Sequence, residues 1–585
     1  MLKTLISQIK QYKSNTIKTP IYVAIEVIME VLIPYLMSIL VDQGIENGDM
    51  KVIWIYGFIM LIAAIISLIA GALSGKHAAI ASSGFAKNLR EAEYKNIQNF
   101  AFADIDKYST GGLITRMMTD VTNVQNAFQM LIRVCVRSPL MLISSLFMAF
   151  MINHELALVF VGVIIFLGIV LFGIAMVVHP IFRRLFKRYD YLNASVQENV
   201  SGIRVVKAYV REDHEIEKFH KESDLIFKIQ QKAEKILIFN SPVMQLSVYG
   251  CILLISWLGA HMIVDGSMTT GELMSLFTYT TSILMSLMML SMVFVMVTMS
   301  AASAERVTEV INETADLHDP QDPVMEVADG SIEFDHVDFS YKKDSKEPVL
   351  KDINLSIRAG ETIGIIGGTG SAKSSLVNLI SRLYDVSSGS VKVGGVDVRD
   401  YHMDSLRNQV AVVLQKNVLF SGTILENLRW GNKEASEEEC RRACQLSCAD
   451  DFIEKMPDKY NTYIEQGGTN VSGGQKQRLC IARALLKKPK VLILDDSTSA
   501  VDTATDARIR RAFAEEIPDT TKLIIAQRIS SIQSADRIIV MDEGKISGFG
   551  THEELMKTNA IYQEVYNSQI KGGGDFDENK GGEQA

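Results

Sequence analysis

Apolar residues are distributed unevenly along the chain. Six long apolar runs occur within the first 300 residues, and each reaches the roughly 20 residues that a helix needs to cross a bilayer. These runs are residues 17–42, 52–76, 130–152, 155–179, 241–264 and 272–299. Beyond them, short apolar stretches alternate with amphipathic ones, which is typical of an α/β domain. The pattern therefore predicts an α-helical polytopic membrane domain with six transmembrane helices, followed by an α/β domain.

Composition and a polar, proline-containing stretch refine this division. The chain has 585 residues, of which 48% are hydrophobic, so it has room for both domains. A polar stretch with Pro320 and Pro323 separates them. We expect five segments: an interfacial elbow helix at 1–15, the membrane domain at 16–312, a linker at 313–330, the α/β domain at 331–571 and a disordered tail at 572–585.

Charges in the connections predict the orientation. The connections near residues 42–49, 153–155 and 265–272 are short and acidic, whereas the others are long and basic. The positive-inside bias therefore places both termini and the α/β domain in the cytoplasm. The compact chain carries no organelle presequence, which favours a bacterial plasma (inner) membrane. The net charge of -9 gives no basic footprint for nucleic acid.

A phosphate-binding loop follows an apolar, strand-like run at residues 362–366. In such a loop, backbone N–H groups and the start of the next helix surround the phosphates. The lysine reaches the β and γ phosphates of ATP, and the next serine holds Mg²⁺. A glycine normally precedes that lysine, so the alanine found here costs about 1 kcal/mol if the position needs a positive φ. The candidate ATP-binding residues are Gly367, Gly368, Thr369, Gly370, Ser371, Ala372, Lys373, Ser374 and Ser375.

Further motifs follow in a fixed order: FSYKK at 339–343, VVLQKNVLFSGT at 412–423, VSGGQKQRL at 471–479, VLILDDSTSAVD at 491–502 and IIAQRIS at 524–530. With the phosphate loop, they make the chain resemble the ATP-binding-cassette (ABC) transporters over nearly its whole length. The resemblance is to a half-transporter of the type I/IV exporter fold, with one membrane domain fused to one nucleotide-binding domain.

The resemblance implies roles for individual residues. Tyr341 would stack on adenine, Gln415 would contact Mg²⁺ and the membrane domain, and Asp495 would hold the Mg²⁺ shell. The signature would close over ATP bound to a second subunit, and residues 499–502 would pass between the two sites. The signature residues are Ser472, Gly473, Gly474 and Gln475.

Two departures from the family pattern concern the chemistry of hydrolysis. Asp496 stands where a glutamate would activate water, and Gln527 stands where a histidine would contact the γ-phosphate. The aspartate is one methylene shorter, and the glutamine cannot become cationic. Because the signature is nearly intact, we expect the degenerate-site subunit of a bacterial heterodimeric multidrug-type exporter, with hydrolysis mainly at the partner's motifs. A homodimeric exporter, an importer of metal chelates and a non-transporting regulatory subunit remain alternatives.

Two cytoplasmic segments match the coupling helices of the family, at residues 103–113 and 208–219. Inside the membrane, Glu26 and Glu30 share one face of the first span, and helix rise places Glu26 at about the depth of Arg137. We expect these three residues to line a substrate cavity, with a structural ion pair or a hydrated inner-leaflet position as the alternatives. A flexible methionine stripe in the sixth span is a second candidate for substrate contact, or ordinary packing: Met285, Met289, Met292 and Met296.

Overall fold

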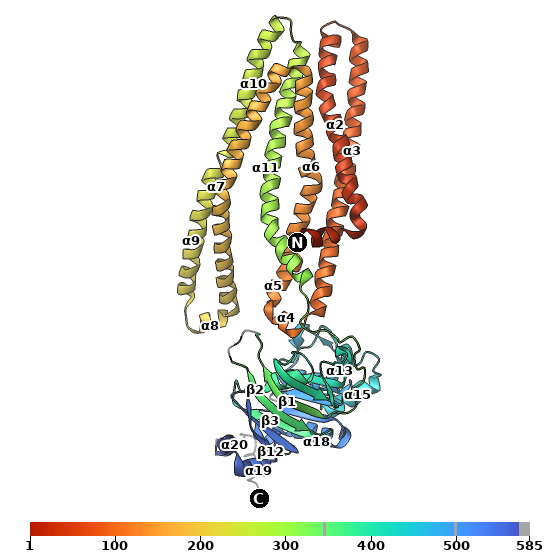
Figure 1. The fold of residues 1–585 in the computed structure, drawn as a ribbon, viewed down its shortest axis with the longest axis vertical. Helices are drawn as coiled ribbons and strands as arrows, with labels where there is room; N and C mark the ends of the chain where they lie inside the picture. Colours follow the sequence, from red (N-terminus) through yellow and green to blue (C-terminus); the bar gives the residue numbers. More distant parts are fainter. Residues whose placement is uncertain (343–344, 346, 497–499, 572–585) are drawn as a thin grey trace. The chain divides into compact units, whose positions relative to one another are not determined.

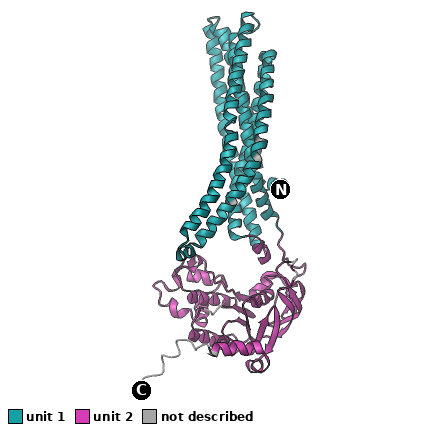
Figure 2. Ribbon diagram, turned by 90° about the vertical axis from the view of Figure 1, so that its left-hand side faces the viewer, with its two compact units in different colours: residues 1–99, 109–313 teal, residues 100–108, 314–585 magenta. Residues whose placement is uncertain are grey.

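The computed structural model describes residues 1–342, 345, 347–496 and 500–571. It divides into two compact units. One comprises Met1–Asn99 with Ser109–Glu313, and the other comprises Phe100–Tyr108 with Thr314–Ala585 (Figure 2). The predicted tail at 572–585 and Ser499 lie outside the described residues.

The first unit is all helical, as the apolar runs predict. Within the described residues, six helical stretches are long and apolar enough to cross a membrane. They extend past the predicted spans because the helices continue into the polar connections. The stretches are Lys10–Ile45, Met50–Asn99, Thr110–Ile152, His154–Ser201, Glu212–Val264 and Thr270–Asn312.

These stretches form two groups of packed helices (Figure 1). In one group, α2 packs against α3 and α6, and α11 packs against α6. In the other, α7 packs against α9 and α10. Small residues such as Ala70, Ser74 and Ala78 are buried along α3, where they permit close helix contact. The bounds are α2 Lys13–Ile39, α3 Met50–Asn99, α6 Val121–Ile152, α7 His154–Ser201, α9 Glu212–Leu237, α10 Asn240–Val264 and α11 Thr270–Asn312.

Short helices interrupt the long connections. The predicted segment 103–113 contains α4 (Phe102–Lys107) and the first part of α5 (Thr110–Thr115). The second short helix, α8 (Ile203–Ala208), ends where the predicted segment 208–219 begins. Val210, at φ 52, ends that turn, and α9 then occupies most of the predicted segment. Before α2, the predicted elbow segment contains α1 (Leu2–Ser7) and a short 3-10 helix, η1 (Lys10–Tyr12).

The second unit is built on a six-stranded sheet in the order β12-β11-β3-β10-β9-β6. Strands β11, β3, β10, β9 and β6 run parallel to one another. The edge strand β12 pairs antiparallel with β11. The bounds are β3 Thr362–Gly367, β6 Val410–Val413, β9 Val491–Asp495, β10 Thr521–Ile525, β11 Arg537–Asp542 and β12 Lys545–Gly550. Every residue of β9 and β10 is buried, as expected for central parallel strands covered on both faces.

Alternate residues of these strands supply two cores. Ile524 and Leu494 belong to one hydrophobic cluster, with α17 (Gly473–Leu485) and α18 (Thr503–Glu516). Leu523 and Ile493 belong to the other, with α12 (Lys373–Ile380) and a four-stranded sheet in the order β2-β1-β4-β5. The bounds of that sheet are β1 Ile332–Phe339, β2 Leu350–Ile357, β4 Ser388–Val393 and β5 Val396–Asp397. The six-stranded sheet is therefore held firmly between two cores, and its strand ends are fixed in space.

Candidate functional site

The sheet topology gathers the predicted motifs at one edge. Asp495 is in register with Ile525 of β10, which is in register with Ile365 of β3. The phosphate loop, Asp496 and Gln527 directly follow these strands, so they all lie beyond the carboxyl ends. This is where ligands bind in parallel α/β sheets.

The phosphate loop has the backbone conformation that the motif requires. Ala372 precedes α12 with φ 70 and ψ 24, in the left-handed region, and Gly370 has φ +85. Position 372 therefore has the positive φ that the sequence left as a condition, and its alanine carries a strain of about 1 kcal/mol. A Cβ on Gly367 would lie 2.3 Å from the carbonyl oxygen of Met541, so only glycine fits at that position.

Lys373 lies over its own loop. Its Nζ donates to the carbonyl oxygens of Gly367 and Gly368, each at 2.8 Å. Burial lowers the pKa of Lys373, and the carboxylates of Asp495 and Asp496 oppose that shift. The ammonium group is thus fixed between the loop and the two acidic residues, where it can neutralise phosphate charge.

The candidate magnesium ligands are oxygen donors. Asp495 is 6% exposed, and burial raises its pKa, with a further increase from Asp496. A hydrogen bond from Ser374 and the charge of Lys373 oppose the increase. Serine hydroxyl and carboxylate oxygens suit Mg²⁺, so Ser374 and Asp495 fit the ion, which would neutralise charge on the phosphates. Gln415 follows β6 and is exposed, and within the described part of the chain it makes no hydrogen bond to these residues.

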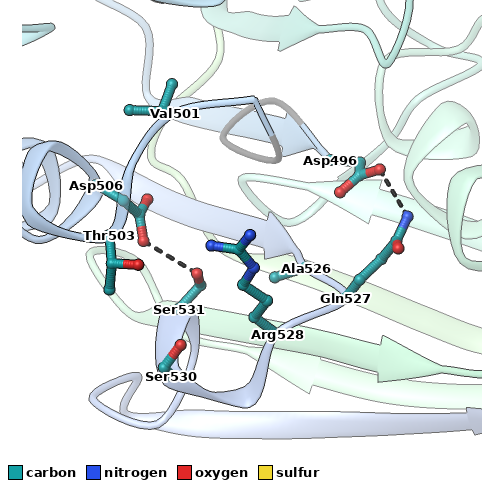
Figure 3. A pocket seen from close by; sticks show the side chains of 9 residues that line it. All are labelled: Asp496, Val501, Thr503, Asp506, Ala526, Gln527, Arg528, Ser530 and Ser531. Atoms are coloured by element: carbon teal, nitrogen blue, oxygen red, sulfur yellow. Dashed lines mark hydrogen bonds between the residues drawn. The ribbon is translucent and has the colours of Figure 1, made fainter. Parts of the chain in front are cut away.

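Asp496 and Gln527 are in direct contact. The Nε2 of Gln527 donates to Oδ2 of Asp496 at 2.9 Å, and the two side chains point toward each other in a cavity of about 150 Å³ (Figure 3). Asp496 has φ 48, and its backbone N–H donates to the carbonyl oxygen of Ile525 at 3.1 Å. One hydrogen bond therefore holds the backbone of Asp496, and another holds its carboxylate. Sequence reasoning named both residues but did not predict that they would bind each other.

Tyr341 lies beside the phosphate-loop helix. Its hydroxyl is 2.8 Å from Oγ of Ser375, and its ring meets the ring of Tyr384 edge-on at 5.1 Å. Tyr341 is 45% exposed, which leaves a face available for an adenine base. The hydroxyl of Tyr384 donates to Asp106 of α4 at 2.7 Å. Tyr384 was missed by sequence reasoning, because no motif surrounds it, and it connects the predicted adenine residue to α4.

The signature forms the start of α17. Ser472 caps the helix: its Oγ accepts from the backbone N–H of Gln475 at 3.3 Å, and its own N–H donates to Oε1 of Gln475 at 2.9 Å. A Cβ on Gly474 would lie 2.7 Å from the carbonyl oxygen of Ala500. Ser472 and Gly473 are exposed, and in the described part of the chain neither forms a hydrogen bond to the phosphate loop. The signature is therefore folded in this chain without contacting the phosphate loop of the same chain through hydrogen bonds.

The predicted intramembrane cluster forms in the first unit. Arg137 of α6 binds Glu26 through Nη1 and Glu30 through Nη2, the latter at 2.7 Å. These three residues line a cavity of about 600 Å³ between α2, α3 and α6. Arg133, one turn before Arg137, also lines it and was missed by sequence reasoning. The methionines of α11 do not line this cavity, and they include Met285, Met289 and Met292, which are exposed.

Comparisons with known proteins agree with both units. Residues 18–308 match the family described as the ABC transporter transmembrane region, and residues 350–499 match the family described as ABC transporter. The uncharacterized ABC transporter ATP-binding protein YfiB of Bacillus subtilis is 36% identical, over 93% of this chain and 94% of its own length. An ATP-dependent lipid A-core flippase of Desulfotalea psychrophila is 38% identical, over 79% of this chain and 80% of its own length. The chain therefore belongs to the ABC transporters, with a transmembrane region fused to an ABC ATPase domain.

Proposed function

We propose that this chain is one subunit of a heterodimeric ABC exporter and that its own ATP site is degenerate. ATP bound at two composite sites closes the nucleotide-binding domains, and the segments at residues 103–113 and 208–219 transmit the closure to the membrane helices. The cavity then changes from inward-facing to outward-facing. Hydrolysis at the site built on the partner's phosphate loop resets the cycle, while the site of this chain holds ATP for longer.

The hydrogen bond between Gln527 and Asp496 carries this proposal. A base that activates water needs a free lone pair directed at that water. The carboxylate of Asp496 is one methylene shorter than a glutamate, and one of its oxygens already accepts from the amide of Gln527. An amide neither takes up nor releases a proton at neutral pH. Both features support slow hydrolysis at a site whose phosphate loop retains its lysine and its binding conformation.

The intact signature supports a partner of a different sequence. Ser472 and Gln475 cap α17 in both directions and are exposed together with Gly473. A subunit that presents a complete signature and an impaired water-activating residue is useful when the partner provides the opposite combination. The two composite sites of such a pair differ, and the competent one uses this chain's signature with the partner's Lys and carboxylate base.

Small amphipathic molecules are the proposed substrates, moved out across the plasma membrane. The flippase relative acts on lipid A-core, a substrate named for that protein. In this chain, the cavity beside Glu26, Glu30 and Arg137 joins charged groups to apolar walls formed by Ile33 and Leu68. A cationic group can compete with Arg137 for the two carboxylates. Replacing both glutamates with glutamine should therefore change the preference between cationic and neutral compounds, and unchanged export of both would remove the cavity from the account.

The test compares ATP turnover of the purified chain alone with turnover of the chain co-expressed with a similar, non-identical half-transporter from an adjacent reading frame. The proposal predicts appreciable hydrolysis only in the mixed complex. A Lys373→Ala change in this chain should leave more of that activity than the equivalent change in the partner. Equal activity of the chain alone would replace the heterodimer with a homodimer in which Asp496 supports catalysis.

A further inference from the structure

A cavity lined by basic residues lies in the nucleotide-binding unit, away from the phosphate loop. It encloses about 370 Å³ between α18, β10 and the segment that follows η6 (Ile529–Ser531). Thr362 is the first residue of β3 and Lys522 the second residue of β10, so the cavity opens at the amino ends of these strands. The motifs of the ATP site follow the carboxyl ends. The residues that line the cavity include Arg510, Arg511, Phe513 and Ile524.

Lys522 is the unusual member of this group. It is 3% exposed and lies in a central strand; its backbone N–H donates to the carbonyl oxygen of Glu361 at 2.9 Å, whereas its ammonium group makes no hydrogen bond or ion pair with another described residue. Burial lowers its pKa, while the more distant charges of Asp536 and Asp519 raise it. The side chain is largely buried and its ammonium group reaches only the cavity, where a charge without a protein partner costs folding free energy. Such violations of packing rules are concentrated at functional positions, so the ammonium group suggests a ligand.

The acidic groups nearest the cavity are already engaged. Asp506 accepts from the hydroxyl of Ser531 at 3.0 Å and lies 3.2 Å from Nε of Arg510. Asp536 accepts from the backbone N–H of Thr362 at 2.8 Å. Asp519 is exposed and acts on Lys522 only through its charge. The positive charge that these carboxylates leave unpaired comes from Lys522 and Arg511.

Arg511 supplies the second available cation. It is exposed, lines the same cavity and forms no ion pair with another described residue. The hydroxyl of Ser534, which accepts from Nη1 of Arg510 at 3.2 Å, adds a polar group at the rim. Phe513, Ile524 and Ala535 provide an apolar wall. The volume of the cavity, about 370 Å³, lies within the range of small-molecule sites, roughly 300–1,000 Å³.

We propose that this cavity binds a small organic phosphate, whose phosphate group contacts Lys522 and Arg511 and whose apolar body packs on Phe513 and Ile524. The cavity lies at the opposite end of the parallel strands from the phosphate loop, and it shares only Ser531 with the cavity beside Asp496 and Gln527. A phosphate dianion provides the charge that these two cations lack, and several oxygens that can accept their N–H groups. The apolar wall favours a phosphate ester over a bare phosphate ion.

The test measures binding of phenyl phosphate to the purified full-length chain by isothermal titration calorimetry. A Lys373→Met background removes binding at the phosphate loop. In that background, phenyl phosphate should bind with the same affinity as in the unmodified chain. Lys522→Met should weaken binding at least about tenfold, and Arg511→Gln about threefold, as expected for loss of a charge-assisted contact. Arg508→Gln is the matched control, because Arg508 lies on the same helix but pairs with Asp451 at 2.8 Å.

The remaining arms separate charge from apolar contact. Benzyl alcohol has the ring without the charge, and inorganic phosphate has the charge without the ring, so both should bind more weakly than phenyl phosphate. Equal affinity for inorganic phosphate would overturn the organic part of the proposal. Unchanged binding in both Lys522→Met and Arg511→Gln, or no saturable binding to the unmodified chain, would overturn the site itself.

Thermal unfolding without ligand gives an independent readout. If Lys522 is kept for a ligand, Lys522→Met should unfold at the same or a higher temperature, because a buried unpaired charge is replaced by an apolar chain of similar length. A clear loss of stability would assign Lys522 a structural role and count against the proposal. Because Arg511 is exposed, Arg511→Gln should fold in any case, and its affinity then decides the result.

Discussion

Lengthening the side chain at position 496 gives the sharpest chemical prediction. Asp496→Glu adds one methylene, which extends the carboxylate by about 1.5 Å. Gln527→His replaces the amide that now donates to Oδ2 of Asp496 at 2.9 Å. If these two features limit hydrolysis, the single change should restore part of the rate and the double change should restore more.

The magnitude follows from geometry and from the hydrogen bond. Misplacement of a catalytic group by about 1 Å costs on the order of 100-fold, or about 2.7 kcal/mol. A hydrogen bond to a charged group contributes about 1.5 kcal/mol, and the exposure of Gln527 reduces this to about 1 kcal/mol. Asp496→Glu alone should therefore raise turnover about 20-fold, since the amide still competes. The double change should raise it about 100-fold.

The assay is phosphate release from the mixed complex in which the partner's base carboxylate is replaced by its amide. Only the site of this chain then contributes. Asp335→Glu, an exposed aspartate on β1, is the control for a methylene added elsewhere. Turnover that stays at the starting rate in both the single and the double variant would refute the reasoning and direct attention to the partner's signature.

Three further predictions concern other contacts. Arg137→Met should lower membrane-domain stability by about 1–3 kcal/mol, because two carboxylates lose their cation; Glu26→Gln in the same chain should recover part of it, and unchanged thermal unfolding would contradict this. Ala372→Gly should change ATP affinity less than about threefold, because the loop already has a positive φ; titration showing tenfold tighter binding would contradict it. Tyr384→Phe removes the hydrogen bond to Asp106 and should lower substrate transported per ATP hydrolysed in proteoliposomes; an unchanged ratio would exclude this contact from coupling.

Much of the fold was predictable because each signal depends on local physics. The six spans follow from the length of the apolar runs, and the nucleotide motifs follow buried strands whose carboxyl ends meet in a parallel sheet. The pairing of Glu26 with Arg137 was predictable from helix rise alone, since both depths can be counted from the ends of their spans. The positive φ at Ala372 was predictable from the glycine that normally occupies this position.

Other features depend on contacts between segments far apart in the chain. Tyr384 meets Tyr341 and Asp106 only because the chain brings β1, α12 and α4 together. Arg133 lines the membrane cavity because it is one helical turn from Arg137, and that spacing was overlooked. The break between α8 and α9 at the left-handed Val210 was not foreseen, because valine rarely adopts a positive φ. The burial of Lys522 could not be predicted, because it is a single lysine in a short strand of otherwise apolar and threonine residues.

Retention of unhydrolysed nucleotide by this chain tests the central claim most directly. During steady turnover of the mixed complex, a photoreactive ATP labelled at the γ-phosphate is crosslinked, and the label on each subunit is compared with that from ATP labelled at the α-phosphate. The account predicts that this chain keeps the γ-label in nearly the same proportion as the α-label, whereas the partner loses most of it. Equal loss from both subunits would show that Asp496 and Gln527 hydrolyse ATP as fast as the partner's residues, and would contradict the degenerate site.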